Sequence, residues 1–253
     1  MKYFVKLTLV LTFISLLSGC ALFGSDNEEF DIPEPQLWEE AKALLDEGNY
    51  EIATTKLELL ESRYPFGRYS EQAQLELIFA YHKQSKPAEA VAAADRFIRL
   101  HPQHENVDYA YYLRGLTHFL QDQSVINRFL PTDMSMRDPG AAKDSFDDFA
   151  TLLERYPNSQ HAPDARKRMI FLRNQLAQYE IHVARYYLRR GAFVAATNRG
   201  RYVVENFPQS TSTADALAVM VTGYTELGLT DLAANAQAVL DQNYPNYPGL
   251  AAE

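Results

Sequence analysis

A residue pair ending in proline recurs five times along the chain, and this recurrence restricts the possible fold more than any other feature. The pairs are Tyr64-Pro65, His101-Pro102, Tyr156-Pro157, Phe207-Pro208 and Tyr244-Pro245. Each proline is preceded at fixed distances by two small residues. Self-similarity of this kind is typical of repeat proteins, in which each unit packs mainly against its neighbours.

The small residues occupy two positions of each repeat. Those 17 residues before the prolines are Gly48, Ser85, Gly140, Gly191 and Gly228, and those 12 residues before are Ala53, Ala90, Ser145, Ala196 and Ala233. The first position suits a helix C-terminus, where glycine adopts positive φ at little cost. The second lets two helix backbones approach closely, and the proline then ends the second helix. Each repeat is therefore predicted to be a helical hairpin.

Apolar residues between these positions follow helical spacing, as in Ala53, Leu57 and Leu60. The pattern resembles the tetratricopeptide repeat, a helical hairpin of about 34 residues. This resemblance implies an all-α fold: a superhelical solenoid of five tetratricopeptide-like helical hairpins.

The third and fourth repeats are longer than the others. Successive prolines are 37, 55, 51 and 37 residues apart, so these two repeats carry 18 and 14 extra residues. Residues 161–190 have no glycine or proline between Pro163 and the end of that stretch, which predicts one long helix. Residues 121–139 contain Pro131 and Pro139 and are predicted to form a loop insertion, a kind of segment that is commonly functional.

The N-terminus has the features of an export signal. Lys2 and Lys6 precede an apolar stretch, Leu7–Leu17. Its 11 residues are too few to cross a bilayer as a helix. Residues 1–19 are therefore predicted to be a signal peptide.

Leu17-Ser18-Gly19-Cys20 resembles the bacterial lipobox, which implies that Cys20 carries fatty acyl chains in the mature protein. The alternative is an unmodified cysteine beside an ordinary cleavage site. Cys20 is the only cysteine, so no intrachain disulfide is possible. Ala21 stands where aspartate would signal retention in the inner membrane, and the resemblance therefore implies sorting to the outer membrane. Residues 20–35, acidic and without helical periodicity, are predicted to form a flexible tether.

Composition argues against nucleic acid as a partner. Loss of residues 1–19 removes two lysines and no acidic residue, so the formal charge of −9 becomes −11. Such an acidic protein binds nucleic acid poorly. The mature N-terminus has no polybasic stretch, which leaves the lipid as the predicted anchor.

No catalytic or metal-binding motif is evident in the sequence. His101, His104 and Glu105 form the only tight cluster around a histidine, and their spacing does not fit a zinc motif. Phosphate-binding loops, a Gly-x-Ser-x-Gly motif and a second cysteine are all missing from the sequence. We therefore expect no enzymatic activity, no cofactor and no metal site.

Several segments together resemble the BamD family, lipoproteins of the outer-membrane β-barrel assembly (BAM) machine. They are Arg63-Tyr64-Pro65-Phe66-Gly67, Asp95-Arg96-Phe97-Ile98-Arg99-Leu100, Tyr156-Pro157-Asn158-Ser159 and Arg189-Arg190-Gly191-Ala192-Phe193-Val194-Ala195. The resemblance implies a non-catalytic, lipid-anchored protein of the outer membrane that faces the periplasm. Residues 36–135, repeats 1 to 3, would receive the C-terminal segments of unfolded barrel proteins. Residues 136–253, repeats 3 to 5, would bind the periplasmic domains of BamA, with other BAM lipoproteins alongside.

The peptide-binding role that the resemblance implies leads to candidate binding residues. An apolar groove with polar ends suits an extended, aromatic-ended peptide, and the candidates for it are Tyr64, Phe66, Arg68, Tyr69 and Tyr81. Packing within the repeats is the alternative role for Tyr64 and Tyr81. The resemblance implies that Arg199 contacts BamA, and a solvated surface charge is the alternative there.

Two other functions fit parts of the sequence. The repeat alone would also suit a lipoprotein that scaffolds peptidoglycan synthesis or the division machinery. An envelope hydrolase or metal-dependent enzyme would need a convergent cluster of titratable groups, which the sequence does not suggest.

Overall fold

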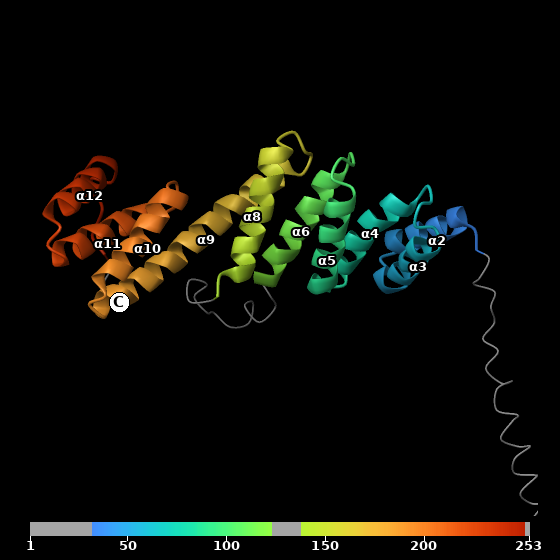
Figure 1. Ribbon diagram of the computed structural model, residues 1–253, viewed down its shortest axis with the longest axis horizontal. Helices are drawn as coiled ribbons and strands as arrows, with labels where there is room; N and C mark the ends of the chain where they lie inside the picture. The colour runs from blue at the N-terminus through green and yellow to red at the C-terminus, as the bar shows by residue number, and fades with distance from the viewer. Residues whose placement is uncertain (1–31, 123–137, 251–253) are drawn as a thin grey trace, which may run out of the picture.

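The computed structural model describes residues 32–122 and 138–250, and these residues form ten helices and no strand (Figure 1). The helices are α2 (Glu34–Asp46), α3 (Tyr50–Arg63), α4 (Ser70–Lys83), α5 (Pro87–Leu100), α6 (Val107–Asp122), α8 (Gly140–Arg155), α9 (Ala162–Arg189), α10 (Phe193–Asn206), α11 (Thr213–Glu226) and α12 (Thr230–Asn243). The predicted signal peptide and the lipidation candidate Cys20 lie outside the described residues.

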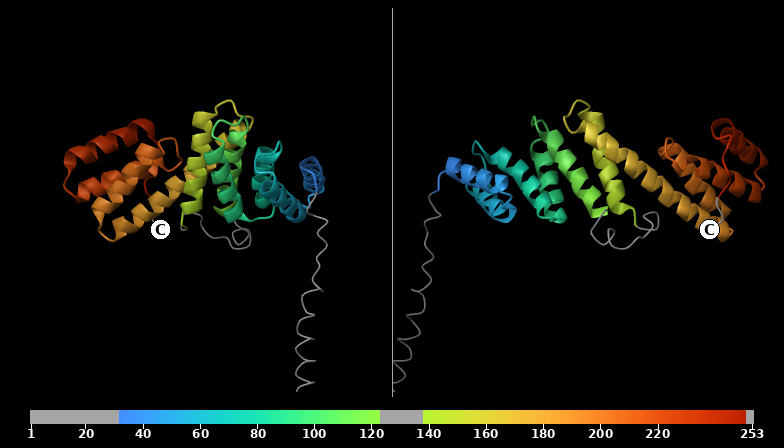
Figure 2. Two further views of the ribbon diagram at one scale, coloured as in Figure 1. Left: turned by 45° about the vertical axis from the view of Figure 1, so that its right-hand side comes forward. Right: turned by 180° about the vertical axis from the view of Figure 1, so that it is seen from behind.

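The helices form five hairpins in an elongated row, α2–α3, α4–α5, α6–α8, α9–α10 and α11–α12 (Figure 1). Each helix packs against the next one in the sequence, and α4 also contacts α6, as α9 contacts α11. Figure 2 shows the same row after rotation, with α2 and α12 at opposite ends. The predicted all-α solenoid of tetratricopeptide-like hairpins is confirmed.

Polar contacts between helices also follow the repeat. The donor and acceptor lie 34 residues apart in Lys42–Glu76, 35 in Arg96–Glu61 and 34 in Arg114–Asp148. These separations are close to one repeat length, so equivalent parts of successive hairpins lie side by side.

Four of the five predicted turns have the expected backbone. Gly48, Gly191 and Gly228 have φ of 78°, 69° and 71°, and Ser85 has φ of 57°. After α2, for example, the amide of Asn49 donates to the carbonyl of Leu44 at 2.8 Å. This backward bond satisfies a carbonyl at the helix end and reverses the chain.

The third repeat departs from the prediction at its small residue. Gly140 does not have positive φ and instead begins α8, directly after Pro139. The reason is the insertion: α6 ends at Asp122, so the chain does not turn directly from one helix into the next at Gly140. Most of the predicted loop 121–139 lies outside the described residues, and Gln121 and Asp122 still belong to α6.

The remaining helix boundaries follow the prolines. Helices α3, α5, α8, α10 and α12 each end two residues before the proline of their repeat, as predicted. Helix α9 spans 28 residues, which confirms the long helix expected in the fourth repeat. The predicted tether 20–35 is too long at its end, because α2 already begins at Glu34. Pro35 is tolerated there, since the first turn of a helix needs no amide donor from it.

Small residues lie where helices cross. Ala53, Ala90, Ser145 and Ala196 are fully buried, whereas Ala233 is only half-buried because α12 is the last helix of the described row. Among the described glycines, the closest approach to a backbone atom of another helix involves Gly200 on α10. A methyl group there would lie 2.8 Å from the carbonyl oxygen of Ala216 on α11.

We therefore expect Gly200→Ala to force α10 and α11 apart. The variant should lose about 1–3 kcal/mol of unfolding free energy, as overpacked interiors do, which chemical denaturation followed by circular dichroism would measure. Gly140→Ala is the matched control, because its new methyl group would meet nothing closer than Asp138 at 3.5 Å. Equal stability of both variants would contradict the close crossing.

Candidate functional site

The turn between α3 and α4, residues 64–69, brings together four of the five candidate peptide-binding residues. Tyr64 donates its hydroxyl to the carbonyl of Ile32 at 3.0 Å, which ties the turn to the chain just before α2 and supports a packing role. Phe66 is fully exposed, the only large apolar side chain among the described residues with no burial at all. Arg68 is exposed and Tyr69 half-buried.

The first residue of α2 fixes the conformation of this turn. The amide of Tyr69 donates to Glu34 Oε1 at 2.7 Å. A Cβ on Gly67 would lie 2.2 Å from the same oxygen, so the absence of a side chain at Gly67 makes room for the carboxylate. A hydrogen bond to an ionised group is stronger than one between neutral groups. Glu34 thereby holds Tyr69 in place.

Cationic and aromatic side chains form a row that runs from this turn along α2. The rings of Trp38 and Tyr69 are stacked, with centroids 5.3 Å apart and planes at 9°. Arg68 lies 5.5 Å from the centre of the Tyr69 ring, and Lys42 lies 5.9 Å from that of Trp38. Such cation–aromatic contacts are worth roughly 0.5–1 kcal/mol each at exposed sites. We call Lys42, Trp38, Tyr69 and Arg68 the aromatic row.

Sequence reasoning missed three residues of this site. Trp38 and Lys42 lie in the first helix and Glu34 at its start, about 30 residues before the turn that they support. One signal could have pointed to them, namely the repeat length itself. Residues one repeat apart lie side by side in a solenoid, and Glu34 precedes Tyr69 by 35 residues.

Tyr81 lies apart from the other candidates. It is 12 residues after Tyr69 on α4, about 18 Å along the helix axis. Its hydroxyl donates to Glu58 on α3. Burial, together with this carboxylate, raises the pKa of Tyr81. The structure therefore separates Tyr81 from the turn and supports its packing role.

Arg199 lies near the other end of the row of hairpins, on α10. Its Nη1 donates to Glu180 Oε2 on α9 at 2.8 Å, and this hydrogen bond raises the pKa of the guanidinium. The Arg199 side chain is 42% exposed, whereas that of Glu180 is 12% exposed. The carboxylate thus positions the arginine while leaving much of it accessible.

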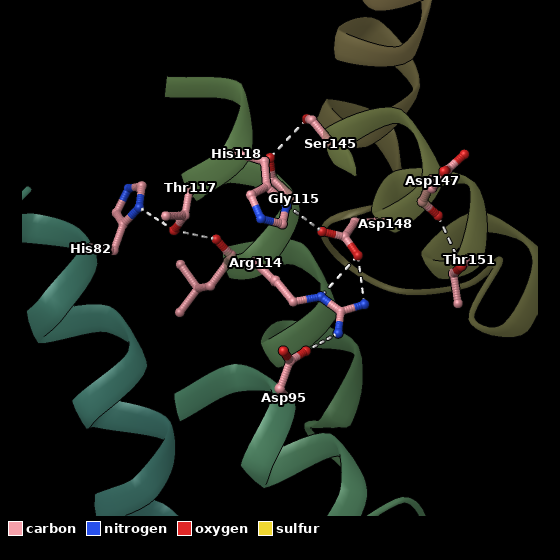
Figure 3. Close-up of polar contacts among 11 residues, drawn as sticks. His82, Asp95, Arg114, Gly115, Thr117, His118, Ser145, Asp147, Asp148 and Thr151 are labelled. Carbon is pink, nitrogen blue, oxygen red and sulfur yellow. Dashed lines mark hydrogen bonds and ion pairs between the residues drawn. The ribbon is translucent and has the colours of Figure 1, made fainter. Parts of the chain in front are cut away.

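A polar cluster joins α5, α6 and α8 in the middle of the molecule (Figure 3). Arg114 Nε donates to Asp148 Oδ1 at 2.8 Å, and the same guanidinium contacts Asp95. His118 Nδ1 lies 2.9 Å from Asp148 Oδ2. Because Asp148 is almost fully buried and all its contacts are internal, the cluster has the features of a structural link between hairpins.

The histidines that drew attention in the sequence also make internal contacts. His101 and His104 pack on the ring of Phe97 at centroid distances of 5.1 and 5.2 Å, and each also approaches Glu71. Within residues 32–122 and 138–250, no group of three or more histidine, cysteine, aspartate or glutamate side chains is arranged to hold a metal ion.

Comparison with known proteins decides the family. Residues 30–240 match the model of the YfiO family, described as outer membrane lipoprotein. The chain belongs to this family. It is 43% identical to outer membrane protein assembly factor BamD of Vibrio cholerae, covering 91% of this chain and 95% of that protein. With BamD of Neisseria meningitidis serogroup A it shares 40% identity, over 97% and 93% of the two chains. With BamD of Xylella fastidiosa strain 9a5c the identity is 42%, over 96% and 82%.

These matches confirm the resemblance to the BamD family. The names of the relatives describe an assembly factor of outer membrane proteins, and this YfiO family member acts in the same process. Among its described helices, none combines the length and apolarity that a membrane span requires.

Trp38 reports on the aromatic row, since it is the only tryptophan of the chain. We expect Tyr69→Ala to expose its indole ring to water, which shifts the fluorescence emission to longer wavelength and increases quenching by acrylamide. Tyr202→Ala, a comparable truncation on the distant α10, serves as control. Unchanged Trp38 emission in the Tyr69 variant would argue against the stack.

Proposed function

We propose that this protein is a non-catalytic adaptor, which docks unfolded β-barrel precursors by their C-terminal segments and couples them to BamA for folding and insertion. Its membership of the YfiO family assigns it to outer-membrane protein assembly. The observation that carries the docking role is the fully exposed Phe66 beside Arg68 and the Tyr69–Trp38 stack.

The chemistry of this turn suits the end of an aromatic-ended peptide. An exposed phenylalanine gains apolar contact when a second ring covers it, and stacked or edge-to-face ring pairs contribute about 0.5–1.5 kcal/mol beyond burial. The guanidinium of Arg68 can form two hydrogen bonds with a terminal carboxylate. Glu34 and Trp38 hold Tyr69 before any peptide arrives, which lowers the ordering cost of binding.

Arg199 is the proposed contact with the periplasmic domains of BamA. An exposed arginine whose guanidinium is already held by the carboxylate of Glu180 suits an interface, where arginine is a frequent anchor. The turn between α3 and α4 belongs to the N-terminal hairpins, whereas Arg199 belongs to the C-terminal hairpins. Other BAM lipoproteins would bind to surfaces alongside.

Attachment through acyl chains on Cys20 is proposed to keep the protein at the outer membrane, facing the periplasm. Several acyl chains anchor a protein far more firmly than one. Scaffolding of peptidoglycan or division machinery is less well supported, because the curated relatives are named as assembly factors of outer membrane proteins.

Client docking is tested with the double variant Arg68→Glu, Tyr69→Ala. Crosslinking to a photoreactive peptide with the C-terminal segment of a barrel protein should fall at least fivefold. The terminal carboxylate of the peptide would meet the negative charge of Glu in place of Arg68, and the peptide would lose its contact with the Tyr69 ring. Arg99→Glu, a charge reversal at an exposed position of α5, should crosslink normally. We call residues 64–69 the docking turn. Equal crosslinking of all forms, with thermal stability unchanged, would show that this turn does not bind the peptide.

Coupling to BamA is tested with Arg199→Glu. The new carboxylate would face Glu180 and repel an acidic partner group, so we expect several-fold less BamA to co-purify from detergent-solubilised membranes. Arg201→Glu is the control, since Arg201 lies two residues later on the same helix and is 55% exposed. Full recovery of BamA with the Arg199 variant would remove this assignment.

A further inference from the structure

A cleft of about 350 Å³ opens between successive hairpins, next to the docking turn. It is bounded by α4, by the start of α6 with the residues before it, and by the turn that leads into α9. Three repeats thus contribute to one cavity, whose residues belong to none of the sites described above.

Three side-chain amides line this cleft, one from each repeat: Gln72, Asn106 and Gln160. Among the described residues, no hydrogen bond reaches the side chain of Gln72 or Asn106, and Gln160 only approaches His161 at 3.4 Å. An amide group offers both donors and an acceptor. Amides on successive repeats can therefore bind the N–H and C=O groups of an extended polypeptide.

The remaining wall of the cleft is largely uncharged and partly aromatic. Leu75 and Tyr109 line it beside His161, whose ring stacks on Tyr109 at 5.2 Å and on Tyr112 at 4.5 Å. Burial lowers the pKa of His161, so its ring is neutral near pH 7. Leu75 is only 2% exposed, so the rings of Tyr109 and His161 are the surfaces that an aromatic side chain of a ligand would contact.

One ion pair limits which side chains fit. Glu76 lines the cleft and accepts a hydrogen bond from Lys42 on α2 at 2.9 Å. Because the two charges already neutralise each other, a charged ligand side chain would be desolvated without a partner of its own. The cleft therefore favours uncharged side chains, and an acidic one would also meet Glu76 directly.

The cleft begins one helical turn after the turn that carries Arg68 and Tyr69. Tyr69, Gln72 and Glu76 are separated by three and four residues, so they lie on one stripe of the first turns of α4. Gln72 is only about 4.5 Å beyond Tyr69 along the axis. A peptide whose end contacts Arg68 and Tyr69 is therefore close to the first of the three amides.

We propose that this cleft is a second peptide subsite, which binds an extended segment through its main chain and accepts an uncharged aromatic side chain against Tyr109 and His161. This inference rests on the proposed docking of barrel-protein segments and adds to it a position upstream of the peptide end. Strands of membrane barrels alternate in side-chain direction and are rich in aromatic residues. Such strands supply the ligand chemistry that the cleft selects.

The test uses the mature protein in detergent and three fluorescein-labelled ten-residue peptides. All end in phenylalanine with a free carboxylate, and they differ at one upstream position, which is phenylalanine, alanine or glutamate. Fluorescence anisotropy gives the dissociation constants. We expect the phenylalanine peptide to bind at least fivefold more tightly than the alanine peptide, and the glutamate peptide to bind weakest.

Variants separate this inference from the docking turn. Gln72→Ala with Asn106→Ala should weaken binding of the phenylalanine peptide at least fivefold, and Tyr109→Leu should remove the preference for phenylalanine over alanine. Gln103→Ala is the matched control, since Gln103 is exposed in the same turn as Asn106 and does not line the cleft.

Each outcome decides between the two proposals. If the amide variants bind like the unmodified protein while Arg68→Glu weakens binding, the second subsite is wrong and the docking turn stands. Equal dissociation constants for the three peptides would also overturn the second subsite. If neither the amide variants nor Arg68→Glu changed the dissociation constant, the second subsite and the proposed docking function would both be wrong.

Discussion

The close approach of paired helices at small residues is the constraint on which the rest of this structure depends. Where a carbonyl oxygen of α11 would lie 2.8 Å from a methyl group on Gly200, no larger side chain fits without separating the helices. A methyl group on Gly115 of α6 would lie 2.9 Å from a side-chain atom, on the Phe149 ring of α8. Interiors packed at such density do not deform gradually. The relative positions of neighbouring helices are therefore restricted by a few close contacts at glycine.

This fixed stacking builds the proposed binding surfaces from residues that are distant in the sequence. The aromatic row combines Trp38 and Lys42 of α2 with Arg68 and Tyr69 before α4, and the adjoining cleft takes residues from three repeats. No single hairpin carries either surface. Stability and recognition are thus coupled, because a change in the helix crossing would also move the side chains that meet a partner.

Much of the fold could be predicted from the sequence, since it depends on local backbone chemistry. Proline beyond the first turn interrupts a helix, and glycine permits the turn at Gly48, Gly191 and Gly228. Gly140 was wrongly placed in a turn, because a pattern of spacing does not show where an insertion interrupts the hairpin. The start of α2 at Glu34 was missed for a related reason, since proline both ends helices and begins them.

The site was less predictable, because its geometry comes from contacts between repeats. Phe66, Arg68 and Tyr69 could be chosen as residues of a turn, but their support by Glu34 and Trp38 depends on how α2 packs on α4. Tyr81 was grouped with them on chemical type alone, and the length of α4 separates it. The roles of Cys20, the turn and Arg199 stay predictions.

Helix α9 has a consequence for how the two ends of the molecule are related. Its 28 residues extend about 42 Å without an internal glycine, and it contacts α8, α10 and α11. Its length therefore sets the distance between the earlier and the later hairpins. Because each helical residue advances the chain by about 100°, lengthening α9 by one residue would rotate α10 and Arg199 to a different side. The register of this single helix sets the direction in which the last hairpins face.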